Sequence, residues 1–237
     1  MSIDALDRVT KRAGDLQDKI LEVYNEIEEK WAMPEEQASG DVINVDKLRL
    51  RLNAAEEADN FKALELAAGK GQLTKFYKDI FNKVFAVEKN ESKAKKLIEL
   101  LGVENVFVGD NQDFLEKELQ KHIDFTFVDF DHWGSPSKLI QEFFQRVKGK
   151  KQDGFVLAFT DSTLTTFKIR GNINLYYHYL QGEDEPVKVT DEMYERFESF
   201  VDGFVENVSR KHGFEAQKIN GKRNSRETAY YTAYRID

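Results

Sequence analysis

The chain has 237 residues and a formal net charge of −8 at pH 7, a length that suits one large domain or one domain with an appendage. It contains no cysteine, which excludes disulfides, thiol nucleophiles and zinc–thiolate sites. An acidic chain lacks the overall basic surface of general nucleic-acid binders, so such a role needs a local basic patch or a basic partner. No apolar run reaches the roughly 18 residues of a membrane span, and the polar N-terminus does not resemble a signal peptide. We therefore expect a cytoplasmic protein that makes no membrane contact.

The first 33 residues have the pattern of an amphipathic helix. Its apolar residues follow an alternating three-four spacing, with charged residues between them, and form a heptad seam of Leu6, Val9, Ala13, Leu16, Ile20, Val23 and Ile27. The seam can form a coiled coil with a second copy or a partner protein, or pack on its own domain, and the pattern leaves these alternatives open. Pro34 indicates a break. Residues 34–59 are interpreted as a linker and helical approach, and 60–237 as the main domain.

From residue 60 onward, apolar strands alternate with amphipathic helices. Strands are expected within 62–71, 83–90, 105–110, 123–131 and 153–161, and helices within 72–82, 91–102, 111–122 and 135–150. This alternation predicts an α/β fold with a parallel sheet covered by helices on both faces. A long helix is expected over 190–213, followed by two strands around a polar turn in 214–236.

A glycine turn follows the first predicted strand, in "ELAAGKG". Ligands of doubly wound sheets bind at the carboxyl ends of the strands, and Gly69 and Gly71 would let the backbone approach a ligand closely. Glu88 lies at the end of the next strand, where an acid commonly binds ribose hydroxyls. A nucleotide-bearing cofactor is therefore expected at this edge of the sheet.

The charges around the turn favour S-adenosylmethionine over a dinucleotide. Thr74 stands where a dinucleotide fingerprint has a further glycine or alanine. Glu65, four residues before Gly69, suits a sulfonium and an ammonium better than a diphosphate. Asp110, at the end of the third strand, is placed to meet the adenine amino group.

These segments resemble the class I S-adenosylmethionine-dependent methyltransferases. "LELAAGKG" is similar to the family's cofactor loop, with Ala67 where a glycine is common, "VFAVEKN" to its ribose-binding strand and "VFVGDNQDF" to its adenine-binding strand. The resemblance implies a Rossmann-like seven-stranded sheet whose last strands form a hairpin, with the helical extension before it. It also implies S-adenosyl-L-methionine as the cofactor, bound by Glu65, Ala67, Gly69, Gly71, Glu88, Lys89, Asp110, Asn111 and Asp129.

A narrower resemblance lies in "VDFDHWGSPSKLI", which is similar to the D-x-D-P-F/Y-G-S-P motif of the tRNA N2,N2-dimethylguanosine methyltransferases. The later "GFVLAFTDSTL" is similar to that family's fifth strand, which also ends in Thr-Asp. In that family the motif aspartate faces the guanine amino group, and the matching residue here is Asp131. His132 and Trp133 stand at the motif's proline and aromatic positions. The resemblance implies methylation of an exocyclic amine of a nucleobase, in RNA.

The loop residues suit that chemistry on physical grounds. An exocyclic amine is a poor nucleophile because its lone pair is conjugated, and an acceptor such as Asp131 can hydrogen-bond its N–H and take up the developing charge. Trp133 offers a ring for stacking an extruded base, or packs in the core. Asp129 is either the catalytic acid or a support for the loop. The candidate catalytic residues are therefore Asp131, Asp129, His132 and Trp133, and no metal is expected.

Basic residues near the predicted rim are candidates for binding a substrate, together with Trp133. Lys168 and Arg170 follow the fifth strand, and Lys222 and Arg223 lie in the tail turn, where phosphate contacts would add salt-dependent affinity. Two alternatives to an RNA methyltransferase remain open. One is transfer to DNA, protein or a small molecule; the other is a weakly active or inactive methyltransferase fold that serves as a binding or assembly subunit.

Overall fold

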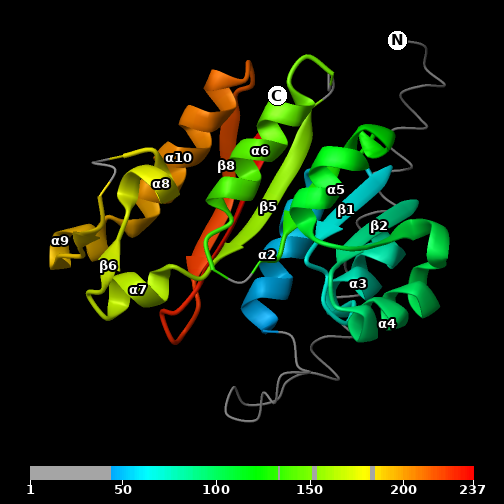
Figure 1. Ribbon diagram of the computed structural model, residues 1–237, viewed down its shortest axis with the longest axis horizontal. Coiled ribbons are helices and arrows are strands. Elements are labelled where there is room, and N and C mark those ends of the chain that lie inside the picture. Colours follow the sequence, from blue (N-terminus) through cyan, green and yellow to red (C-terminus); the bar gives the residue numbers. More distant parts are fainter. Residues whose placement is uncertain (1–43, 133, 151–153, 182–184) are drawn as a thin grey trace.

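The computed structural model describes residues 44–132, 134–150, 154–181 and 185–237. They form a seven-stranded sheet in the order β3-β2-β1-β4-β5-β9-β8, parallel through β5 and antiparallel at β9 and β8 (Figure 1). The strands are β1 Lys62–Leu66, β2 Lys83–Glu88, β3 Val106–Val108, β4 Phe127–Phe130, β5 Phe155–Asp161, β8 Ala216–Arg223 and β9 Tyr230–Ile236. The predicted α/β Rossmann-like fold and its terminal hairpin are confirmed.

The central strands are buried along their whole length. Every residue of β1, β4 and β5 is buried, because helices cover both faces of a parallel sheet. This explains why these segments read as continuous apolar runs rather than as alternating patterns. It also means that the acids Glu65 and Asp129, within β1 and β4, lie in the interior.

Helices of matching amphipathic pattern cover the two faces. One face carries α5 Asn111–Lys117, α6 Ser137–Val147, α8 Leu175–Tyr179 and α10 Phe197–Lys211; the other carries α2 Val45–Glu56, α3 Gln72–Ile80 and α4 Glu91–Leu101 (Figure 1). Helix α6 is representative: Ile140, Phe143, Phe144 and Val147 are fully buried at three-four spacing and pack against the sheet.

Helix α2 belongs to the core of the domain. Asn44 caps it by accepting a hydrogen bond from the Lys47 N–H at 3.1 Å, and Leu48 and Leu52 are buried against the sheet. Residues 45–56 of the segment interpreted as a linker and helical approach are thus helical and supply part of one covering layer, while residues 34–43 lie outside the described residues. The heptad seam of residues 1–33 lies outside the described residues.

The region after β5 differs most from the prediction. The helix expected over 190–213 is divided into α9 Asp191–Glu195 and α10, with Arg196 between them. Between β5 and α9 lie the helices α7 Leu164–Lys168 and α8. The same segment contains a two-stranded sheet of β6 Asn172–Ile173 and β7 Val187–Lys188. The described ranges also contain two short 3-10 helices, η2 Val103–Asn105 and η3 Leu119–His122. Among the described residues, no helix combines the length and apolar character needed to span a bilayer.

Candidate functional site

The turn after β1 contains three residues with positive φ: Ala67 at 59°, Gly69 at 60° and Gly71 at 79°. A Cβ added to Gly69 would meet no atom within 4 Å, so the backbone there borders open space that a ligand can occupy. A Cβ on Gly71 would lie 2.8 Å from Leu97 Cδ2. A side chain at Gly71 would therefore displace Leu97 of α4, whereas Gly69 has the surroundings expected of a ligand-binding glycine.

Hydrogen bonds join this turn to the ends of the next two strands. The Gly69 N–H donates to Glu88 Oε2 and the Asn90 N–H donates to Oε1, both at 2.8 Å. The Ala67 N–H donates to Asn111 Oδ1 at 3.2 Å. Residues predicted from three separate strand ends therefore lie together at one edge of the sheet.

Charged residues that follow β2 and β3 lie close enough to the loop after β4 to affect His132. Asp110 caps α5 by accepting from the Gln112 N–H at 2.9 Å, and its side chain is exposed. Burial lowers the pKa of His132, and the nearby Lys89 ammonium lowers it further, while Asp110 opposes them. His132 is therefore neutral at pH 7 and lies among the ends of β2, β3 and β4.

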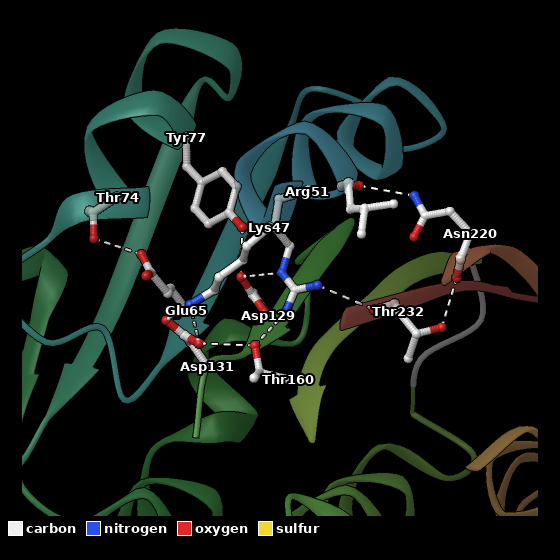
Figure 2. A network of polar contacts seen from close by, with 11 residues as sticks. Lys47, Arg51, Glu65, Thr74, Tyr77, Asp129, Asp131, Thr160, Asn220 and Thr232 are labelled. Carbon is white, nitrogen blue, oxygen red and sulfur yellow. Dashed lines mark hydrogen bonds and ion pairs between the residues drawn. The ribbon is translucent and has the colours of Figure 1, made fainter. Parts of the chain in front are cut away.

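Beneath this edge is a buried polar network between the sheet and helices α2 and α3 (Figure 2). Asp129 Oδ2 accepts from Arg51 Nε at 2.9 Å and from the Tyr77 hydroxyl at 2.6 Å. Glu65 Oε2 accepts from the Thr74 hydroxyl at 2.6 Å. Arg51 and Asp129 are both fully buried. Of the two alternatives for Asp129, these surroundings favour a residue that supports the loop over one that touches substrate.

Glu65 belongs to the same network. It pairs with Asp129 across β1 and β4 and is 1% exposed. Burial, and then the neighbouring Asp129, raise the pKa of Glu65 well above its usual range, which favours the neutral acid. We expected Glu65 to present a negative charge to a cationic ligand. Its buried position, which favours the neutral acid, does not agree with that expectation.

Asp131 lies at the outer end of the network. Both of its carboxylate oxygens accept from Lys47 Nζ at 2.5 Å, and Oδ1 also accepts from the Thr160 hydroxyl at 3.1 Å (Figure 2). Burial opposes ionisation of Asp131, but the Lys47 ammonium holds its pKa below the ordinary value. Its side chain is 24% exposed, so Asp131 is partly open to solvent at the end of β4.

The loop after Asp131 is connected to β5 and α6. Gly134 has φ +98°, and its carbonyl accepts from the Ser162 N–H at 3.0 Å. Ser135 Oγ accepts from the Ser137 N–H at 3.3 Å. The helix begins at Ser137, so Pro136 precedes its first turn by one residue. Trp133 lies outside the described residues, and its assignments as a catalytic and substrate-binding residue stay predictions.

The four cations predicted to bind substrate have partners within the chain. Lys168 Nζ donates to the Arg226 carbonyl, Arg170 pairs with Asp191 at 2.7 Å, Lys222 with Asp46 at 3.0 Å, and Arg223 with Glu198 at 2.9 Å. Arg223 also lies over the Tyr194 ring. The charges of Arg170, Lys222 and Arg223 are therefore partly offset by acids of the chain, whereas Lys168 is held by a neutral carbonyl.

Sequence reasoning did not identify the basic partners of the two motif aspartates. Lys47 and Arg51 are four residues apart in α2 and therefore share one helical face. That face also buries Leu48 and Leu52. In the sequence, two basic residues four positions apart stand next to the buried apolar residues of the same helix. This pattern could have indicated that α2 turns its basic residues toward acids of the sheet.

A further buried carboxylate, Asp161, lies at the end of β5, outside the network of α2 and α3. Oδ1 accepts from the Thr163 N–H at 2.8 Å and Oδ2 from the Tyr179 hydroxyl at 3.1 Å. Burial raises the pKa of Asp161 to about 6, although these hydrogen bonds oppose the shift. Between the unfolded and folded pKa values the native state binds more protons, so stability falls as pH rises from about 4 to 6.

Asp161→Asn should remove this pH dependence. From pH 4 to 7 the wild type should lose up to about 3 kcal/mol more unfolding free energy than the variant, measured by urea denaturation at each pH. An amide can still accept from the Thr163 N–H and donate to Tyr179, so the variant should fold. Parallel stability curves for the two proteins would contradict the prediction.

Comparison with known proteins identifies the fold. Neither a protein-family model nor a curated protein matches the sequence. Among solved structures, Trm1 from Pyrococcus horikoshii, in complex with S-adenosyl-L-methionine, is similar with a TM-score of 0.55 and 14% identity, over 81% of this chain and 53% of that one. An S-adenosylmethionine-dependent methyltransferase from Clostridium acetobutylicum has a TM-score of 0.51 and 11% identity, over 92% of this chain and 98% of its own. The chain therefore has the Rossmann-like fold of S-adenosylmethionine-dependent methyltransferases.

Proposed function

We propose that this protein is an S-adenosylmethionine-dependent methyltransferase whose acceptor is an exocyclic amine of a nucleobase in RNA. The observation that carries the proposal is the convergence of the Gly69 turn, Glu88 and Asn111 at one sheet edge, joined by hydrogen bonds. The loop bearing Asp131 leaves the adjacent strand at the same edge. A cofactor and an acceptor would then meet between these strand ends.

The residues present fit the cofactor. Open space beside Gly69 accommodates a ligand against the backbone. Glu88 accepts one backbone N–H at each oxygen, and a carboxylate has about four acceptor positions, so two remain for ribose hydroxyls. The exposed Asp110 is available to the adenine amine. When bound, S-adenosylmethionine supplies an activated methyl group. The fold shared with Trm1, solved with S-adenosyl-L-methionine, also supports this cofactor.

Asp131 would receive the acceptor amine. Lys47 occupies one acceptor position on each of its oxygens and Thr160 occupies a third, which leaves about one of the four for an incoming N–H. The ion pair keeps the carboxylate charged at neutral pH, so it can stabilise positive charge that develops on the nitrogen. The assignment of a nucleobase amine rests on the motif around Asp131.

The test is methyl transfer to RNA by Asp131→Asn. Incorporation of tritium from labelled S-adenosylmethionine into total RNA should fall by about 100-fold or more, while calorimetry should show unchanged cofactor binding. Asp124→Asn is the matched control, because Asp124 also pairs with a lysine, Lys62 at 2.6 Å, but precedes β4 at the opposite sheet edge. Equal transfer by both variants would refute the role of Asp131.

A second candidate function is a cofactor-binding assembly subunit that performs no transfer. The observation that favours it is the engagement of both Asp131 oxygens by Lys47. In that case the wild type would bind S-adenosylmethionine but would label neither RNA, DNA nor protein. Labelling of DNA or protein alone would instead identify a different acceptor.

A further inference from the structure

A groove of about 560 Å³ lies on the face of the sheet that carries α6, α8 and α10. These helices lie side by side in Figure 1. Lys138 of α6 and Lys148, directly after α6, line the groove on one side, and Lys211 and His212 line it from the end of α10, together with the apolar side chains of Leu180 and Val208. We call Leu180 and Val208 the apolar floor of the groove. The groove is thus basic in a protein whose net charge is −8.

The lysines of the groove have no acidic partner among the described residues. Within the part of the chain that the structure describes, Lys138, Lys148 and Lys211 make no ion pair. The one acid in the lining, Glu142, pairs with Arg146 at 3.4 Å. Burial lowers the pKa of His212, and the positive charges of the neighbouring Lys148 and Lys211 lower it further. The groove therefore presents net positive charge to solvent, which favours an anionic ligand.

The lysines of the groove differ from the basic residues that the sequence predicted to bind substrate. Lys168, Arg170, Lys222 and Arg223 all have partners within the chain. A polyanion would have to displace those partners, whereas the lysines of the groove are exposed. Electrostatic complementarity favours the groove on α6 and α10 over the terminal hairpin.

The groove also leads away from the candidate site. Helix α6 begins at Ser137, directly after the loop that follows Asp131. Lys138 lies in its first turn and Lys148 follows its last residue. Ten residues of helix span about 15 Å, a length that covers several nucleotides of one strand. A strand that places one base at the Asp131 loop can continue along α6.

We propose that this groove binds the phosphate backbone of the RNA whose base enters the candidate site. The proposal rests on the proposed function for its choice of RNA. Lys138, Lys148 and Lys211 contact phosphates, which position the strand without reading its sequence. The apolar floor and the two glutamines of the lining, Gln141 and Gln145, are available to sugars and bases.

The test is RNA binding by the triple variant Lys138→Gln, Lys148→Gln and Lys211→Gln, measured by fluorescence anisotropy with a labelled single-stranded RNA of mixed sequence. Affinity should fall by about 10- to 100-fold at 0.1 M salt, and the slope of log K against log salt should decrease by about 2. The matched control is Lys75→Gln, Lys93→Gln and Lys96→Gln on α3 and α4. It changes the net charge equally on the opposite face and should bind RNA as the wild type does.

The outcomes separate this proposal from the proposed function. Equal affinity of the two triple variants, or a wild type that does not bind the RNA, overturns the groove assignment. A wild type that binds duplex DNA but not RNA through these lysines overturns the choice of RNA. Cofactor binding should be unchanged in the groove variant. If the groove binds RNA but no base is methylated, the proposed function is wrong, and the assignment of the groove as an RNA-binding surface is still supported.

Discussion

Gly69→Arg is expected to reduce S-adenosylmethionine binding by about 100-fold or more, equivalent to about 2.7 kcal/mol. The reason is steric: the space beside Gly69 is open in the structure, and an arginine side chain would occupy the volume that we assign to the cofactor. The Gly69 N–H to Glu88 bond ties the same position to the proposed ribose-binding acid. Isothermal titration calorimetry with S-adenosylmethionine measures the effect.

The matched control for this variant is Gly149→Arg. Gly149 has φ +67°, close to the 60° of Gly69, and a Cβ there also meets no atom within 4 Å. The cost of placing a side chain at positive φ is therefore similar in both variants. Gly149 lies after the end of α6, away from the cofactor turn. Equal cofactor affinity in the two variants would show that the turn does not bind the cofactor.

Arg51→Met is expected to reduce the free energy of unfolding by about 3–5 kcal/mol. Arg51 donates to Asp129, to the Thr160 hydroxyl at 3.2 Å and to the Thr232 carbonyl at 3.3 Å. Methionine fills similar volume but leaves Asp129 as a buried charge without a cationic partner. Urea denaturation monitored by tryptophan fluorescence and circular dichroism measures the loss.

Two further variants separate the buried charge from a general effect of losing an arginine. Arg51→Met combined with Asp129→Asn should recover more than half of the loss, because the uncompensated carboxylate is gone. Arg235→Met removes an arginine from the partly exposed pair with Glu57, at 3.0 Å, and should cost less than about 1 kcal/mol. A cost below 1 kcal/mol for Arg51→Met itself would contradict the assignment.

Much of the fold followed from local patterns. Strands buried on both faces are apolar throughout, and the helices between them have one apolar face, so β1 to β5 and their connecting helices were predicted from periodicity. The segment between β5 and α10 was not, because its short elements are stabilised by tertiary contacts. Tyr179, for example, is fully buried among the aromatic rings of Phe167, Phe197 and Phe200.

The candidate site was predicted in part for a topological reason. Residues that end successive parallel strands must share one edge of the sheet, so Gly69, Glu88 and Asn111 could be grouped before any contact was known. The grouping did not reveal which groups reach the surface. Glu65 and Asp129 are both acids near strand ends, yet each is buried in the network of α2 and α3.

The amino-acid sequence by itself determined the α/β class, the order of strands and helices up to β5, and the set of polar residues at the strand ends. Local periodicity and short-range turn chemistry encode these features. Only the tertiary structure decided how charges are paired: Lys47 with Asp131, Arg51 with Asp129, and three of the four predicted rim cations with acids elsewhere in the chain. Such pairs join residues far apart in sequence, so the positions of both partners depend on the packing of whole elements. The same packing left the lysines of α6 and α10 without partners among the described residues.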